Sequence, residues 1–184
     1  MATVVDQAKS QMDKTIESTK ENFSDIRTGR ANPSLLNGIM VDYYGAPTPI
    51  KSLASVSVPE PRSLAVTPFD SSQASAVEKA IRDSDLGVNP NRDGKVIRVT
   101  LPELTEDRRK DYVKIAKTKA EDGKVALRNI RRKAKESIEA SVKDGDLGED
   151  EGERLQKDLD ALTKRMSGEI DQLLESKQQE ILEV

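Results

Sequence analysis

The stretch KDYVKIAKTKAEDGKVALRNIRRKAK, residues 110–135, decides the fold of this chain. At about 100° per residue on a helix, its side chains separate into two faces. One face collects Tyr112, Ile115, the stem of Lys119, Gly123, Ala126, Ile130 and Ala134. The almost opposite face, here named the basic stripe, consists of Lys110, Lys114, Lys117, Lys124, Arg128, Arg131, Arg132 and Lys135, with Glu121 as the only acid among them. The apolar face predicts a packing partner within the chain, and the basic stripe predicts a docking surface for a polyanion.

Composition excludes several classes of function. The 184 residues include no Cys and no His, which excludes disulfides, thiolate chemistry, a Ser-His-Asp triad and His- or Cys-ligated zinc. Aromatic residues make up only 3%, so stacking of bases on aromatic rings is not the main mode of any nucleic-acid contact. No phosphate-binding loop occurs, and the acidic run 144–153 lacks the residue spacing of an EF-hand. We therefore expect no enzyme, with no catalytic residue, cofactor or metal site.

Charge is distributed unevenly along the chain. Residues 105–143 hold thirteen basic and seven acidic side chains, whereas residues 144–184 hold five basic and thirteen acidic ones. A basic helix followed by an acidic one predicts partial neutralisation between packed neighbours. The first residues contain no apolar run long enough for a signal peptide or a membrane span, so we expect a cytoplasmic protein with no membrane partner.

Three stretches have helical periodicity. Residues 2–28 place Val5, Ala8, Met12, Ile16, Thr19, Phe23 and Ile26 at steps of three and four. We expect Gly29 to be the left-handed C-cap of this helix, and Pro33 prevents its continuation. A second helix should run from the N-cap Thr105 to about Val142, and a turn at 144–148 should lead to a third, with apolar residues at Leu155, Leu159, Leu162, Met166, Ile170, Leu173 and Ile181. Because three apolar seams must bury one another, these helices predict an elongated antiparallel three-helix bundle.

Residues 34–104 have a different character, with frequent Gly and Pro and short alternating patterns. We expect strands at 39–44, 53–58, 64–67 and 95–101, a turn at 45–49, a loop at 85–91 and a helix at 71–83 with Ala76, Val77, Ala80 and Ile81 inward. The fold class predicted is therefore α+β. A bundle of residues 1–29 and 105–184 carries a small domain, residues 30–104, inserted between its first and second helices. Two chain crossings join the parts, which predicts a bent molecule with a hinge.

The basic stripe has an ordinary alternative, a solvated helix face. Two features favour the polyanion: Lys or Arg recurs every three or four residues, and the arginines 128, 131 and 132 lie mid-helix, where the helix dipole does not explain them. Guanidinium groups also present a fork of donors that suits phosphate oxygens. The leucine seam of the last helix has its own alternative, a coiled-coil dimer, but the other two helices supply partners within the chain, so we expect a monomer.

Several blocks of sequence, in one order over the full length, resemble the bacterial ribosome recycling factor family. They are IRTGRANPSLL (26–36), VDYYG (41–45), AVEKAI (76–81), SDLGVNPN (84–91), LTEDRRK (104–110) and VALRNIRR (125–132). The resemblance implies an L-shaped molecule, a three-helix bundle with a small β/α/β domain inserted at a flexible elbow. Pro68 before Phe69 and the loop 92–95 depart from the family pattern.

The resemblance also implies a function and its residues. Such a protein binds the ribosome after translation termination and, with elongation factor G and GTP hydrolysis by that partner, splits the complex into subunits. Its bundle lies against large-subunit ribosomal RNA, and the candidate RNA-binding residues here are Arg128, Arg131, Arg132, Lys124, Lys135, Arg27 and Arg30. The candidate hinge residues are Gly29, Arg30, Ala31, Asn32, Leu104 and Thr105.

Other functions predict different behaviour. A coiled-coil adaptor that binds a protein partner along the bundle would show weak salt dependence, and a carboxylate-based hydrolase would turn over substrate without a partner. For the RNA-binding role we expect Arg131→Ala to weaken ribosome binding by about 1–3 kcal/mol. Burial of the three guanidinium groups against the acidic last helix would contradict that role.

Overall fold

The computed structural model describes residues 3–183, which divide into two compact units. One unit comprises residues 3–28 and 106–183, and the other comprises residues 29–105. Each unit has its own apolar core, and the cores share no residue. Within residues 3–183, no helix is long and apolar enough to cross a membrane.

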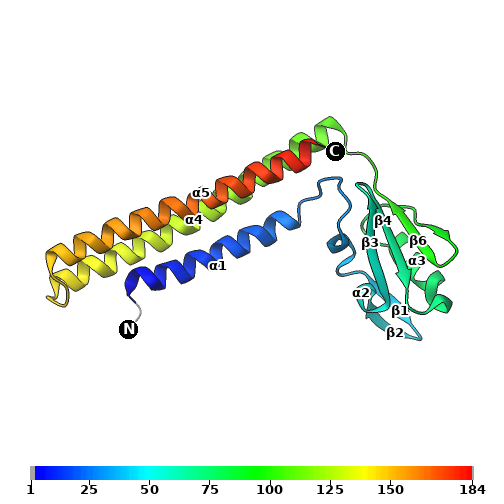
Figure 1. Ribbon diagram of the computed structural model, residues 1–184, viewed down its shortest axis with the longest axis horizontal. Coiled ribbons are helices and arrows are strands. Elements are labelled where there is room, and N and C mark those ends of the chain that lie inside the picture. The colour runs from blue at the N-terminus through cyan, green and yellow to red at the C-terminus, as the bar shows by residue number, and fades with distance from the viewer. Residues whose placement is uncertain (1–2, 184) are drawn as a thin grey trace. The chain divides into compact units, whose positions relative to one another are not determined.

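The first unit is a bundle of three helices, α1 (Val4–Ser24), α4 (Glu106–Lys143) and α5 (Glu149–Leu182) (Figure 1). Helix α4 has 38 residues, which corresponds to about 57 Å at 1.5 Å per residue. Gly145, with φ 80°, forms the turn that folds α5 back along α4. The N-terminus of α1 has a capping box, in which the Asp6 carboxylate accepts from the Thr3 backbone N–H (2.9 Å) and the Thr3 hydroxyl accepts from the Asp6 N–H (3.1 Å).

The core of the bundle contains most of the apolar residues that the periodicity predicts. Every residue predicted to face inward from the first helix is buried except Val5, which is half-buried at the edge of the core. Two glycines allow close approach between helices. A Cβ at Gly123 would lie 2.7 Å from the Thr19 hydroxyl oxygen, and one at Gly152 would lie on the Val142 side chain. The buried residues of α4 and α5 are Ala116, Ala120, Gly123, Leu127, Ala134, Ile138, Gly152, Leu159, Leu162, Met166, Ile170 and Ile181.

The buried face of α4 is rotated relative to the predicted one. Ile115, predicted to face inward, is 43% exposed, whereas Ala116, Ala120 and Leu127 are buried. Tyr112 and Ile130 are only partly buried at the edge of the core. The reason is close packing: small alanines lie at the centre of the interface, where they let the helices approach, and larger residues lie beside them.

The end of the first helix also differs from the prediction. Helix α1 ends at Ser24 with Asp25 as its C-cap, so Gly29 is not the C-cap. Gly29 does adopt a left-handed conformation, with φ 77°, but it does so in the connecting segment. Ile26 lies beyond the helix and is still buried in the bundle core, because the chain continues along the bundle after the helical hydrogen bonds stop.

The second unit contains two antiparallel sheets. Strands β1 (Met40–Tyr43) and β2 (Ala46–Pro49) form a hairpin, and β3 (Ala54–Glu60), β4 (Ser63–Pro68), β5 (Asn91–Asp93) and β6 (Val96–Thr100) form a sheet in the order β3-β4-β6-β5. Helix α3 (Ala74–Arg82) buries Ala74, Val77 and Ile81. The short helices are η1 (Pro33–Leu36), α2 (Ile50–Leu53) and η2 (Ser71–Gln73).

One local prediction in this unit is wrong: residues 45–49, predicted as a turn, contain β2. The predicted loop 85–91 holds except at Asn91, where β5 begins. Both strands are short and have no buried residue, so they lack the alternating apolar residues by which a strand is recognised. The α+β class, a three-helix bundle with a β-sheet domain inserted between its first and second helices, is confirmed.

Candidate polyanion-binding surface on the bundle

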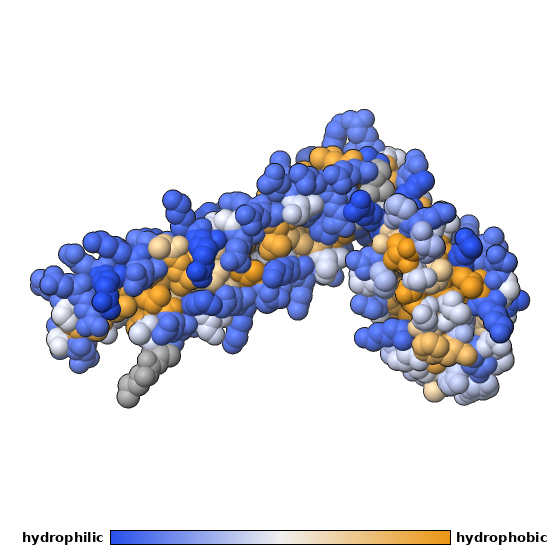
Figure 2. Space-filling model, in the orientation of Figure 1, coloured by the Kyte–Doolittle hydropathy of each residue, from blue (hydrophilic) through white to orange (hydrophobic). Residues whose placement is uncertain are grey.

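The basic stripe runs along α4 beside the core rather than opposite it. Lys124 and Arg131 are only partly exposed, with 23% and 42% of their side chains accessible, because they lie at the boundary between α4 and α5. The prediction that the stripe lies almost opposite the buried face is therefore wrong for these two residues. Arg128 and Arg132 are exposed. Hydrophilic residues cover most of the visible face of the helices, and apolar residues appear between them (Figure 2).

Five cations of the stripe have carboxylate partners. Two partners belong to α5: the Arg131 Nε donates to Asp160 Oδ1 at 2.7 Å, and Lys124 contacts Asp171. Within α4, the Arg128 Nη2 donates to Glu121 Oε1 at 3.0 Å. Lys110–Glu106 and Lys135–Glu139 complete the set as neighbours four residues apart. The acidic last helix thus neutralises part of the stripe, but it does not bury the guanidinium groups.

Three cations of the stripe remain without an ion pair among the described residues. They are Lys114, Lys117 and Arg132, and all three are exposed. Lys114 and Arg132 are 18 residue steps apart in α4, which is about 27 Å along the helix axis. Unpaired exposed cations on a rigid helix can accept phosphate oxygens without first breaking an internal contact.

The candidate hinge residues lie in the two segments that connect the units. Ala31 and Leu101 both donate backbone N–H groups to the β3–β4 turn, Ala31 to the Pro61 carbonyl (2.7 Å) and Leu101 to the Arg62 carbonyl (2.8 Å). Arg62 also pairs with Glu103 at 2.9 Å. Both connecting segments are therefore fixed to the same turn of the second unit.

The other candidate hinge residues, and the candidate RNA-binding residues outside α4, have the following environments. Asn32 is extended (φ −139°, ψ 131°), and its side chain accepts from the Ser34 N–H at 2.9 Å. Leu104 is half-buried and Thr105 is exposed. Arg27 and Arg30 are both exposed but belong to different units. Arg27 lies in the bundle unit with the α4 arginines, whereas Arg30 lies in the second unit.

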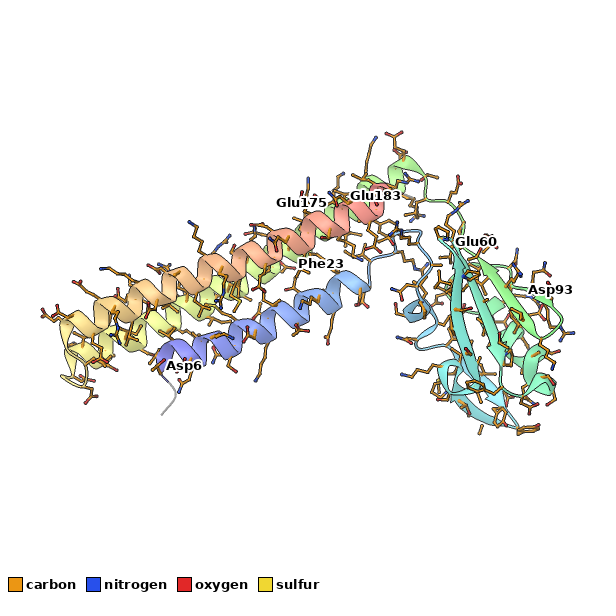
Figure 3. The ribbon with its side chains drawn as sticks, viewed as in Figure 1. Asp6, Phe23, Glu60, Asp93, Glu175 and Glu183 are labelled. Carbon is orange, nitrogen blue, oxygen red and sulfur yellow. The ribbon has the colours of Figure 1, made fainter. Side chains whose placement is uncertain are left out.

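The carboxylates that contact the stripe were missed by the sequence reasoning. Asp160, Asp171 and Glu121 are ordinary acids on helix surfaces, and no motif marks them. Folding the chain back at residues 144–148 indicates only that acids of α5 lie beside cations of α4, and it does not indicate which acid meets which cation. Figure 3 shows the charged side chains along α4 and α5, with Glu175 labelled on α5. Phe23, on α1, faces the other two helices.

The fold and this surface define a class of protein: a three-helix bundle with an inserted β-sheet domain, which presents a long charged helix face. Within residues 3–183, no group of three or more carboxylates is placed to hold a metal ion. The ribosome recycling factor profile matches residues 19–182. The recycling factor of Bifidobacterium adolescentis is 74% identical over 184 residues and is covered completely, as is this chain.

Solved structures give the same result. A solution structure of a ribosome recycling factor is 40% identical, with a TM-score of 0.76 over 98% of this chain and 96% of that one. The T. thermophilus recycling factor, placed with E. coli elongation factor G bound to the E. coli post-termination complex, is 44% identical, with a TM-score of 0.66 over 97% of both chains. This chain belongs to the ribosome recycling factor family, whose members are translation factors and not enzymes.

Proposed function

We propose that the chain recycles ribosomes by docking the basic stripe of α4 on large-subunit ribosomal RNA, with elongation factor G and GTP then splitting the post-termination complex. The observation that carries this proposal is the group of three exposed cations, Lys114, Lys117 and Arg132, that have no ion pair among the described residues. GTP hydrolysis belongs to the elongation factor, since this sequence contains no phosphate-binding loop. A translation factor of this kind works in the cytoplasm as a monomer.

Arg132→Ala tests the docking surface. Loss of a charged hydrogen bond to phosphate should weaken binding to large ribosomal subunits by about 1–3 kcal/mol. The slope of log K against log salt should also become shallower by about 0.7–0.9, the value for one lost phosphate contact. Arg165→Ala on α5 is the matched control, because Arg165 is exposed, has no ion pair among the described residues and lies outside the stripe. Equal binding by the two variants in a pelleting assay would refute the proposal.

We further propose that residues 30–104 act as a movable domain on the bundle formed by 1–29 and 105–184. The contacts of Ala31 and Leu101 with the β3–β4 turn support a hinge concentrated at Gly29 and Arg30 in one segment and at Leu104 and Thr105 in the other. The hydrogen bonds hold Ala31 to the inserted domain, so it moves with that domain, and the neighbouring Asn32 moves with it. Movement of this domain by the elongation factor would let the bundle transmit force to contacts between the ribosomal subunits.

Glu106→Pro tests the hinge. Proline is tolerated at the first position of a helix and restricts the residue before it, here Thr105. The variant should bind ribosomes normally and split them more slowly. Glu106→Ala is the control, since it removes the ion pair with Lys110 without adding the ring. A parallel loss of binding and splitting in Glu106→Pro would contradict a hinge at this position.

A further inference from the structure

The cations of the basic stripe differ in how they can reach a phosphate. Arg132 has no ion pair among the described residues, whereas Arg128, Arg131 and Lys124 each contact a carboxylate. The N–O distances of 2.7 Å for Arg131–Asp160 and 3.0 Å for Arg128–Glu121 are those that a guanidinium group makes with a phosphate oxygen. In this structure, each of these carboxylates therefore occupies a place that an RNA phosphate would take.

Exposure shows that the pairs can exchange. The side chains of Asp160 and Glu121 are 57% and 56% accessible, and those of Arg131 and Arg128 are 42% and 62% accessible. Ion pairs this exposed contribute about 0.2–1 kcal/mol, so they open readily when another anion approaches. They nevertheless reduce the positive potential of the stripe, because each brings a negative charge to within contact of a cation.

We infer that Glu121, Asp160 and Asp171 compete with RNA phosphates for Arg128, Arg131 and Lys124, and thereby set the affinity of the docking surface. This inference rests on the proposed docking of the stripe on RNA. RNA binding then replaces internal ion pairs by phosphate contacts at three positions and adds contacts outright at Lys114, Lys117 and Arg132. The exchange lowers the net gain per phosphate, which limits binding to stray RNA and favours release after each round of recycling.

The test removes the competing charge and keeps the side-chain shape. Asp160→Asn and Glu121→Gln retain an oxygen that can accept from the guanidinium group. Binding is measured to large ribosomal subunits and to a labelled RNA hairpin of unrelated sequence across a salt series. The matched control is Asp13→Asn, which changes the net charge equally and breaks an exposed ion pair with Lys9 on α1 (2.8 Å), outside the stripe.

Asp160→Asn and Glu121→Gln should each bind both probes about threefold more tightly than Asp13→Asn does, within the range expected for freeing one surface ion pair. Their salt slopes should be steeper by up to about 0.7–0.9. Unchanged thermal unfolding would show that the gain is not structural. The inference is overturned if the variants match Asp13→Asn, or if they bind more weakly with unchanged unfolding. Failure of Arg132→Ala to weaken binding would instead refute the docking itself, so the two failures are distinguishable.

Discussion

Gly123→Ala should destabilise the bundle although alanine is the better helix former. Glycine in a helix interior costs about 0.5–1 kcal/mol relative to alanine, so propensity alone predicts a gain. The added Cβ, however, would lie 2.7 Å from the Thr19 hydroxyl oxygen and 3.0 Å from Ile170 Cδ1. Thr19 is 3% exposed and donates to the Thr15 carbonyl at 2.8 Å, so its rotation out of the way would break a partly buried hydrogen bond. Overpacking of this kind costs about 1–3 kcal/mol, which leaves a net loss of up to about 2.5 kcal/mol.

Urea unfolding followed by circular dichroism at 222 nm measures this effect. Gly168→Ala in α5 is the control, because nothing lies within 4 Å of its added Cβ, and it should stabilise by about 0.5–1 kcal/mol. A double-mutant cycle with Thr19→Ala should recover about 1 kcal/mol in the Gly123→Ala background, since it removes the nearest clashing atom. If Gly123→Ala and Gly168→Ala proved equally stabilising, the close approach of α1 and α4 at this point would be refuted.

Three further outcomes are expected. The Thr3 backbone N–H lowers the pKa of the Asp6 carboxyl. The contribution of Asp6 to the free energy of unfolding should therefore be complete above the ordinary pKa of 3.8 and should disappear as the pH falls through the lowered pKa. A Tm difference between wild type and Asp6→Asn that is unchanged at very low pH would contradict this. Ile138→Ala should cost about 2–5 kcal/mol in urea unfolding because Ile138 is fully buried, whereas Leu182→Ala, at a side chain 59% exposed, should cost little. Gly29→Ala should destabilise by about 1 kcal/mol because Gly29 has φ 77°, and an unchanged unfolding curve would argue against that conformation.

Apolar periodicity predicts the large elements of this fold. The three helices follow from repeats of three and four residues, and their antiparallel packing follows from the turn at 144–148. The same periodicity fails at short elements. Strands β2 and β5 have no buried face, so their pairing depends on neighbouring strands rather than on their own side chains. Apolar periodicity also predicts the wrong buried face for α4. It gives more weight to the hydrophobic Ile115 than to Ala116, whereas close helix packing favours the alanine.

The sequence predicts which cations form the basic stripe, but it does not predict which carboxylates pair with them. Sequence order shows that cations recur along α4, and it shows an excess of acids in α5. Which acid meets which cation depends on the rotation of both helices about their axes, and that rotation is set by core packing. Asp160 and Asp171 consequently have no distinguishing feature in the sequence, although each contacts a member of the stripe.

Arg131 and Arg132 are adjacent in sequence and should respond differently to replacement by alanine. Arg132→Ala removes one cation, whereas Arg131→Ala removes a cation and also leaves the Asp160 carboxylate without its partner at 2.7 Å, facing the incoming RNA. Because the wild-type Arg131 gives up its contact with Asp160 when it binds a phosphate, Arg131→Ala should weaken binding to large ribosomal subunits by less than Arg132→Ala does. The double variant Arg131→Ala/Asp160→Asn should bind large ribosomal subunits about threefold more tightly than Arg131→Ala alone, because it lacks the uncompensated carboxylate charge. Absence of this rescue in a ribosome pelleting assay, with Arg131→Ala still weakened, would mean that Asp160 lies outside the reach of the bound RNA.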